Sequence, residues 1–170
     1  MPDPARPRPA KPALVPLAAA LAILGCSAAE EPEPTVNAAT GETFTQFVED
    51  GVAIGGYDPV AYFEDGGPAE GSAEHTAEWH GATWRFASAE HKNAFEADPE
   101  KYAPQYGGYC AWALGEKDSL APIDPTVWTV VGDKLYLNYD RGVQEKWLAD
   151  RDALIERADE NWPGHAGGRG

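Results

Sequence analysis

Two side chains in the middle of the chain, His91 and Cys110, have the chemistry of a transition-metal site. An imidazole and a thiolate favour copper or zinc over magnesium or calcium. His91 falls in the first turn of an expected helix, where the positive end of the helix dipole disfavours the protonated ring. A metal ion needs the neutral imidazole. The pair and one further donor would therefore suit copper or zinc, provided that the fold brings them together.

A third ligand could come from polar side chains on or before an expected β-hairpin. His75 and His80 have opposite parity in one strand, so only one of them can face such a site if the strand is regular. His80 is preferred because it is nearer the turn. The candidate third donors are His80, His75, Tyr57, Asp58 and Glu78.

The two main candidates also have structural interpretations. His91 and Phe95 share a helix face at spacing i, i+4, so the imidazole could fill space above a core ring and bond a backbone carbonyl. Cys110 could be a buried apolar residue, because free cysteine is among the most buried residue types. A redox-active thiol and a link between subunits are the remaining alternatives. The preceding Gly107 and Gly108 suit a tight site or merely a tight turn.

The elements that must position these residues are short. Ser88 is the candidate N-cap of a helix that carries His91 and ends at Asp98, because Pro99 disfavours helical backbone at the preceding residue. Runs of aromatic and β-branched residues around turn residues predict two β-hairpins. They join 75–80 to 83–86 around Gly81-Ala82, and 128–131 to 134–138 around Gly132-Asp133.

The remaining segments complete a small α+β domain. Phe44 and Phe47, spaced i, i+3, suggest a short helix over 43–50, followed by a brief strand over 52–54. Asp58 is a candidate N-cap before a single helical turn over 59–63. After Asp140, another candidate N-cap, an apolar stripe at helical spacing continues until Trp162-Pro163. Two hairpins with short helices around them favour one α+β domain.

The amino-terminal 25 residues have the pattern of an export signal. Arg6, Arg8 and Lys11 form a basic region, and the apolar run over 13–24 is too short to span a bilayer. The run ends in Ile-Leu-Gly-Cys, which resembles a bacterial lipoprotein signal that is cleaved and lipidated at Cys26. The alternative is an ordinary secretory signal cut nearby, for instance after residue 28 or 29, which would give a soluble periplasmic or secreted protein.

The sequence therefore predicts four segments: a signal peptide (1–25), lipidated Cys26 with a linker (26–42), a folded domain (43–163) and a flexible tail (164–170). The linker is rich in alanine, proline and glutamate without apolar periodicity, as expected of a disordered tether. The tail is rich in glycine and contains His165. The expected location is the periplasmic side of a bacterial membrane, with the lipid as the only membrane attachment.

The strong negative charge argues against two classes of partner. Residues 1–25 carry three basic side chains and one acidic, a net charge of +2, so removing them from the total of −15 leaves −17. Such a surface repels nucleic acid and anionic lipid. Plain solubility is its simplest consequence. Neither nucleic acid nor an anionic membrane surface is therefore expected as a partner.

Several motifs in the right order resemble the YHS-domain family. They are GGYDPVAYF, an aromatic-rich hairpin, WRFASAEHKNAF with DPEKY after it, YAPQYGGYCAWA, WTVVGDKLYLNY and NWP. The resemblance is densest over 55–112, and the longer pattern over 43–163 is similar to exported single-domain YHS proteins. It implies a small treble-clef-like core and a role in metal handling, because members of the family occur beside metal-handling proteins and bind metal through cysteines. The partner that the resemblance implies is thus a metal ion or a metal-handling protein. The family cysteines fall on Ala61, Ala87 and His91, so one of three ligand positions keeps a metal-binding side chain, changed from thiolate to imidazole.

No convincing catalytic constellation is present, so the chain is expected to bind rather than to catalyse. Ser88 lies one turn from His91 but is needed as a cap, and no orienting acid is evident. The leading prediction is an exported, lipid-anchored YHS protein that binds copper or zinc for handling or sensing. The alternative is a metal-free YHS scaffold that binds a protein or small ligand. A thiol-based enzyme built on Cys110 with His91 is the third hypothesis.

Overall fold

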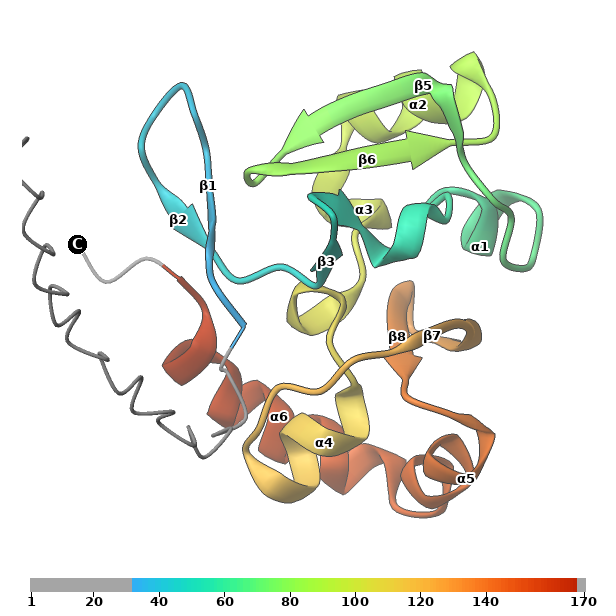
Figure 1. The fold of residues 1–170 in the computed structure, drawn as a ribbon. Coiled ribbons are helices and arrows are strands. Elements are labelled where there is room, and N and C mark those ends of the chain that lie inside the picture. Colours follow the sequence, from blue (N-terminus) through green and yellow to red (C-terminus); the bar gives the residue numbers. More distant parts are fainter. Residues whose placement is uncertain (1–31, 168–170) are drawn as a thin grey trace, which may run out of the picture. The chain divides into compact units, whose positions relative to one another are not determined.

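The computed structural model describes residues 32–167, in which short strands and helices alternate (Figure 1). The strands are β1 (Thr35–Val36), β2 (Thr43–Phe44), β3 (Val48–Glu49), β4 (Val52–Ala53), β5 (Ser72–Trp79), β6 (Ala82–Phe86), β7 (Asp124–Val131) and β8 (Lys134–Asn138). The helices are α1 (Ala61–Glu64), α2 (Ala89–Ala97), α3 (Pro99–Tyr102), α4 (Ala111–Lys117), α5 (Arg141–Ala149) and α6 (Arg151–His165), with 3-10 turns η1 (Ile54–Gly56) and η2 (Gln105–Gly108). This confirms the α+β class. The expected signal peptide and lipidated Cys26 lie outside the described residues.

The first predicted hairpin is β5–β6, at one edge of a four-stranded sheet with the order β3-β4-β6-β5. Its turn consists of His80 and Gly81, whose positive φ values of 52° and 74° suit the two-residue turn that matches strand twist. The sequence placed this turn one residue too late, at Gly81-Ala82. His80 is therefore a turn residue and not a strand residue.

The second predicted hairpin, β7–β8, is confirmed with Gly132-Asp133 at its turn. Strand β8 alternates as expected, because Leu135 and Leu137 enter one hydrophobic cluster and Tyr136 enters another. This strand therefore belongs to both halves of the core.

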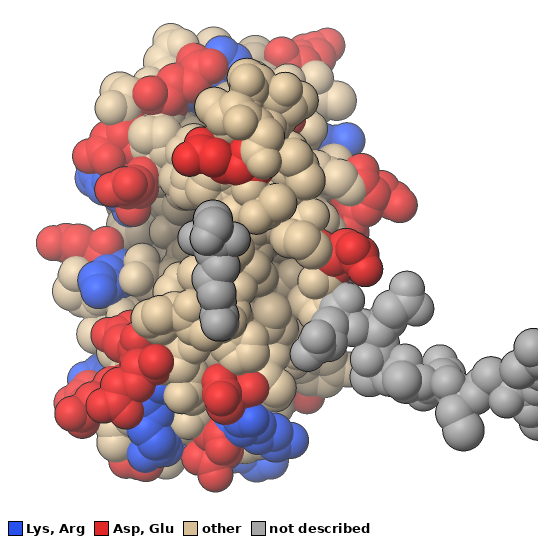
Figure 2. Space-filling view, turned by 90° about the vertical axis from the view of Figure 1, so that its left-hand side faces the viewer, with Lys and Arg blue, Asp and Glu red and all other residues tan. Residues whose placement is uncertain are grey.

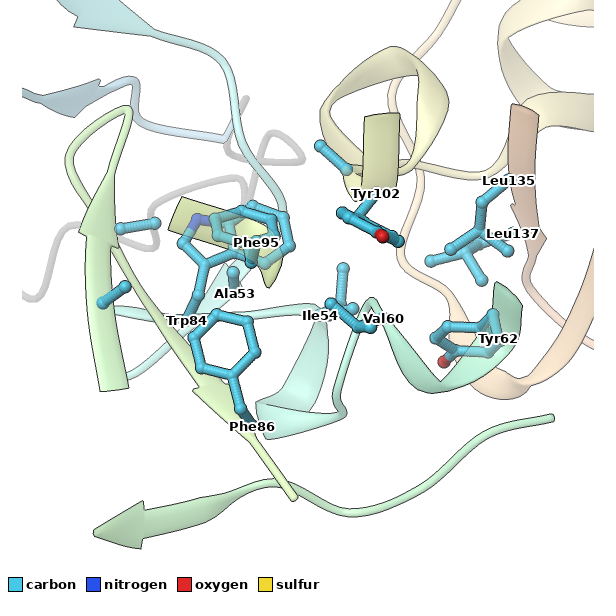
Figure 3. Close-up of a cluster of buried hydrophobic side chains, with 13 residues drawn as sticks. Ala53, Ile54, Val60, Tyr62, Trp84, Phe86, Phe95, Tyr102, Leu135 and Leu137 are labelled. Carbon is cyan, nitrogen blue, oxygen red and sulfur yellow. The ribbon is translucent and has the colours of Figure 1, made fainter. Parts of the chain in front are cut away.

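The larger cluster packs the four-stranded sheet against α1, α2, α3 and β8 (Figure 3). Aromatic rings lie at its centre. The Phe95 ring of α2 is 5.1 Å from the Trp84 ring and 5.2 Å from the Phe86 ring, both on β6. Trp84 is fully buried, and its indole N–H donates to the Trp79 carbonyl. These contacts fix the face of α2 that packs on the sheet. Because His91 lies four residues before Phe95, its side chain projects from the same face one turn earlier.

The smaller cluster joins α4, α5, α6 and η2 around Trp147 and Tyr136. Asp140 caps α5 by accepting from the Val143 N–H at 2.7 Å, as its position predicted. The expected end of the last helix was wrong, because α6 continues through Pro163 to His165. The N-terminal part of the chain contacts the last turn of α6, because the Thr45 hydroxyl donates to the His165 carbonyl at 2.5 Å.

The predicted helix over 43–50 is also wrong, because this stretch forms β2 and β3. The phenylalanines that suggested a helix contact different partners. Phe44 stacks on the His80 ring at 3.8 Å, and Phe47 makes an edge contact with the Tyr109 ring at 5.7 Å. These long-range contacts outweigh a weak local preference for helix.

The expected linker ends earlier than residue 42, because Thr35–Val36 forms β1 and pairs with β2. The Thr35 hydroxyl donates to the His80 carbonyl at 2.6 Å. The Val36 backbone packs so closely against Gly81 that a Cβ at position 81 would lie only 2.6 Å from it. Residues 35–47, hereafter the N-terminal strap, therefore belong to the folded domain. Composition alone could not reveal this, since the contacts are made with residues 45 positions away.

Candidate metal site

His91 lies in the first turn of α2, and its backbone N–H is capped by Ser88. The Ser88 hydroxyl accepts a hydrogen bond from the His91 backbone N–H at 3.1 Å, which makes Ser88 the predicted N-cap. The helix ends at Asp98, which in turn caps α3 through the Lys101 N–H. The His91 side chain is 17% exposed, so the ring lies at the surface edge of the core.

Asp58 is fully buried and receives hydrogen bonds from the start of α1, from the β6–α2 connection and from α2. Its Oδ1 accepts from the backbone N–H groups of Val60 at 2.8 Å and Ala61 at 3.4 Å, at the start of α1. Its Oδ2 accepts from the Ala87 N–H at 2.8 Å and from His91 Nδ1 at 2.7 Å. Four donors satisfy the carboxylate, which is how a buried acid is tolerated. Asp58 is thus occupied within the protein and orients His91.

The contact with Asp58 fixes which ring nitrogen of His91 can bind a ligand. A carboxylate only accepts hydrogen bonds, so Nδ1 carries the hydrogen and the neutral ring keeps its lone pair on Nε2. Nε2 lies 3.9 Å from Asp65 Oδ2, beyond hydrogen-bond distance. The Asp65 side chain is 57% exposed. Two donors of different type, one nitrogen and one oxygen, therefore flank the same point at the surface.

The Glu90 carboxyl, next to His91 in the first turn of α2, lies within electrostatic reach of His91 and of His75. The pKa of the Glu90 carboxyl is lowered, first by a hydrogen bond from its own backbone N–H and then by the Ser88 hydroxyl. Smaller contributions come from His75 and His91. The surface around His91 thus combines imidazole and carboxylate groups.

Cys110 has different partners. It precedes α4 as its N-cap residue, forms a bridge with Leu137 of β8, and is only 1% exposed. Its Sγ donates to Asn138 Oδ1 at 3.7 Å. Burial raises the pKa of the thiol, although nearby backbone N–H groups oppose this. The thiol is therefore protonated and enclosed, as the structural interpretation of Cys110 expects.

His80 also has its own environment. Its ring lies between the rings of Phe44 at 3.8 Å and Trp79 at 3.6 Å, and its Nδ1 is 3.4 Å from Gln46 Nε2. Burial lowers the pKa of His80 from its ordinary value of 6.5, while the charges of Glu100 and Glu42 act in the opposite direction. The imidazole is thus a stacking element that attaches the N-terminal strap to the β5–β6 turn.

This environment predicts a loss of stability in mild acid. Because the folded pKa of His80 is lower than the unfolded value, the unfolded chain binds the proton more readily, and stability falls as the pH drops below about 6.5. His80→Asn keeps a residue that favours the turn. Urea unfolding of both proteins at pH about 7.5 and about 5.5 should show a smaller acid-induced loss in the variant. An equal loss in both proteins would contradict this role of His80.

The other candidate third donors are His75, which acts electrostatically on Glu90, and Tyr57 and Glu78. Tyr57 pairs with Glu70 in an isolated β-bridge, and Glu78 accepts from the Thr83 hydroxyl at 2.6 Å. Within residues 32–167, no group of three or more His, Cys, Asp or Glu side chains could hold a metal ion. Of the candidate set, the structure joins His91 and Asp58 by a hydrogen bond, and it places Asp65, which the sequence analysis had missed, 3.9 Å from His91 Nε2.

Residues 60–106 match the family model of the YHS domain. The chain contains a YHS domain. The match begins just before α1 and ends in η2, so it includes His91 and excludes both Asp58 and Cys110. No curated protein and no solved structure matched the chain.

The structure shows what surrounds the three positions at which the resemblance led us to expect ligands. Ala61, Ala87 and His91 converge in space, because all three donate hydrogen bonds to Asp58. Where the resemblance leads one to expect cysteines around a metal, this chain has a buried carboxylate bound by two backbone N–H groups and one imidazole. These three positions therefore offer no thiolate, and of the groups at them only Nε2 of His91 keeps a lone pair for an ion.

Proposed function

We propose that this YHS-domain protein is exported, anchored to the membrane by lipid at Cys26, and binds a copper or zinc ion through His91 for metal handling or sensing. The hydrogen bond of 2.7 Å between His91 Nδ1 and Asp58 Oδ2 carries the proposal. Metal-binding histidines usually donate their second ring N–H to a carboxylate or carbonyl, which fixes the tautomer and the ring direction. His91 has this arrangement before any ion is bound.

The donor set fits a divalent ion of the copper or zinc type. An imidazole nitrogen and a carboxylate oxygen bind such an ion at about 2.0–2.2 Å, which places the two donors roughly 3 Å apart. His91 Nε2 and Asp65 Oδ2 are 3.9 Å apart, and the exposed Asp65 side chain can close the difference by rotation. Water or a donor from a partner would fill the remaining positions, so the site is open and suited to exchange.

The proposed location rests on the amino-terminal sequence, and the surface charge is compatible with it. Figure 2 shows acidic side chains distributed over the visible face, with fewer basic ones. Such a surface attracts cations loosely and repels anionic lipid, so a lipid chain would be the membrane attachment. None of the helices within residues 32–167 has the length and apolar composition needed to cross a bilayer.

A single substitution separates metal binding from folding. In His91→Asn the side-chain amide nitrogen can replace Nδ1 as a donor to Asp58, while Nε2 is removed. We expect the affinity for Cu(II) or Zn(II), measured by titration calorimetry on the purified protein, to fall about 100-fold or more. Thermal stability without metal should change little, because the hydrogen bond to the buried carboxylate is kept.

The matched control is His165→Asn. His165 is also partly exposed, and its Nε2 lies 2.8 Å from Asp118 Oδ1, far along the sequence from α2. This variant should bind metal as the unsubstituted protein does. If both variants lose metal equally, binding would be nonspecific and the assignment to His91 would be wrong.

The second candidate function is a metal-free scaffold that binds a protein or small ligand. It is favoured by the absence of any three-residue metal-binding group within residues 32–167. It predicts that neither Cu(II) nor Zn(II) raises the melting temperature of the protein, because an ion raises that temperature only if it binds the folded state. An increase that disappears in His91→Asn would decide for the metal site.

A further inference from the structure

The four-stranded sheet ends on one side in β5, the outer strand of the first hairpin (Figure 1). This strand pairs only with β6, since the strand order is β3-β4-β6-β5. At the other edge β3 has 2 residues, whereas β5 has 8. Neither proline nor lysine, which commonly protect such edges, occurs in β5. Strand β5 is therefore the longer open edge of this sheet within residues 32–167.

The hairpin register shows which backbone groups of β5 point away from β6. The two-residue turn at 80–81 makes the residues that flank it a hydrogen-bonded pair, and such pairs alternate along the ladder. Glu78 and Thr76 fall at the positions between, so their N–H and C=O groups face the open edge. The same rule directs the Thr83 N–H away from β5, and this group donates to the Gly51 carbonyl at 3.0 Å. Among residues 32–167, nothing pairs with the outward groups of Thr76 and Glu78.

The side chains along this edge are acidic. Glu74 and Glu78 are both exposed on β5. Glu90, in the first turn of α2, lies within electrostatic reach of His75 on the same strand. The Arg85 side chain of β6 does not neutralise them, because it lies against η1. The open edge of β5 is therefore negatively charged.

This charge decides between two occupants of the edge. Antiparallel pairing with β5 of a second copy would bring glutamates of the two strands opposite or diagonal to each other, and like charges there are destabilising. A strand with Lys or Arg opposite Glu78 instead gains a cross-strand pair of opposite charge. Because side chains alternate, its residue opposite Ala77 faces the core side, where Ala77 and Trp79 are apolar.

We propose that the edge of β5 binds an extended segment of another protein, in which basic and apolar residues alternate, by addition of a strand. Thr76 and Glu78 each supply one N–H donor and one C=O acceptor to the added strand. In this mode of recognition, main-chain hydrogen bonds give affinity and alternate side chains give specificity. The glutamates on β5 select the basic segment. The inference does not require a metal ion at His91.

The test adds a short acetylated peptide that alternates valine with lysine to the purified protein, and follows amide hydrogen exchange by NMR. In the free protein, the N–H groups of Thr76 and Glu78 should exchange much faster than those of Ala77 and Trp79, which the ladder protects. With saturating peptide, exchange at Thr76 and Glu78 should slow by about tenfold or more. The same peptide with glutamate in place of lysine should bind about tenfold more weakly.

Two variants separate the hydrogen bonds from the charge. Thr76→Pro removes one outward N–H that takes no part in the ladder with β6, and should weaken binding of the lysine peptide about tenfold. Glu78→Lys should reverse the preference between the two peptides. Slow exchange at Thr76 and Glu78 in the free protein would overturn the proposal, as would absence of binding at millimolar lysine peptide or binding that leaves both amides unprotected. Should the proline variant not fold, exchange in the unsubstituted protein still decides.

Discussion

Replacing Asp58 with alanine is expected to be among the most destabilising single substitutions in the domain. The carboxylate is fully buried, and its loss leaves the Val60 and Ala61 N–H groups, both in buried residues, without an acceptor. The Ala87 N–H and His91 Nδ1 lie nearer the surface and can find water. Two buried orphaned donors cost about 1–3 kcal/mol each. We expect the free energy of unfolding, measured in urea, to fall by about 2–5 kcal/mol.

Asp58→Asn separates the structural role of Asp58 from its effect on the ring tautomer. The amide oxygen can still accept from the start of α1, but its NH2 group now faces His91 Nδ1 and the Ala87 N–H, which loses its acceptor. His91 can meet it only by making Nδ1 an acceptor, which moves the hydrogen to Nε2. Stability should fall less than in the alanine variant, whereas metal affinity should fall about 10–100-fold, the usual cost of losing an orienting partner. Equal affinity in Asp58→Asn and the unsubstituted protein would contradict the orienting role.

The local part of the fold could be predicted from the sequence because its signals act over a few residues. Ser88 and Asp140 were each identified as caps by residue type and position, and both accept the expected backbone hydrogen bond. The β7–β8 turn follows from Gly132-Asp133 in the same way. Alternation along β8 even indicated which side chains share a face.

The candidate site depends on contacts that sequence patterns do not record. His91 and Asp58 are 33 residues apart, and both were candidates, but as two ligands of one ion rather than as a ligand and its orienting partner. Asp65 was missed because an exposed aspartate after a short helix carries no signal of its own. Cys110 was considered beside His91 because the two are the best donors by type. In the structure the thiol instead contacts Asn138, and the Cys110 backbone pairs with Leu137 of β8.

The second large effect is expected for Gly107→Ala, where the N-terminal strap crosses η2. Gly107 has a φ of 60°, and its carbonyl accepts from the Phe47 N–H at 2.8 Å. A Cβ at this position would lie 2.1 Å from the Thr45 carbonyl oxygen, which is a backbone atom and cannot rotate away. Left-handed backbone costs an alanine about 1–2 kcal/mol, and forcing an atom into a packed contact about 1–3 kcal/mol more. We expect a total loss of about 2–5 kcal/mol in the free energy of unfolding.

Gly132→Ala is the matched control for backbone strain. Gly132 also has a positive φ, 54°, but a Cβ there meets nothing within 4 Å. This variant should therefore lose only the backbone contribution, and the difference between the two variants measures the contact with Thr45. Similar losses of unfolding free energy in both variants would show that the backbone at Thr45 can move away from a Cβ at position 107 without destabilising the fold. A larger loss in Gly107→Ala would establish that residues 45–47 are held against η2 as part of the folded domain, with the strap fixed between the β5–β6 turn and α6.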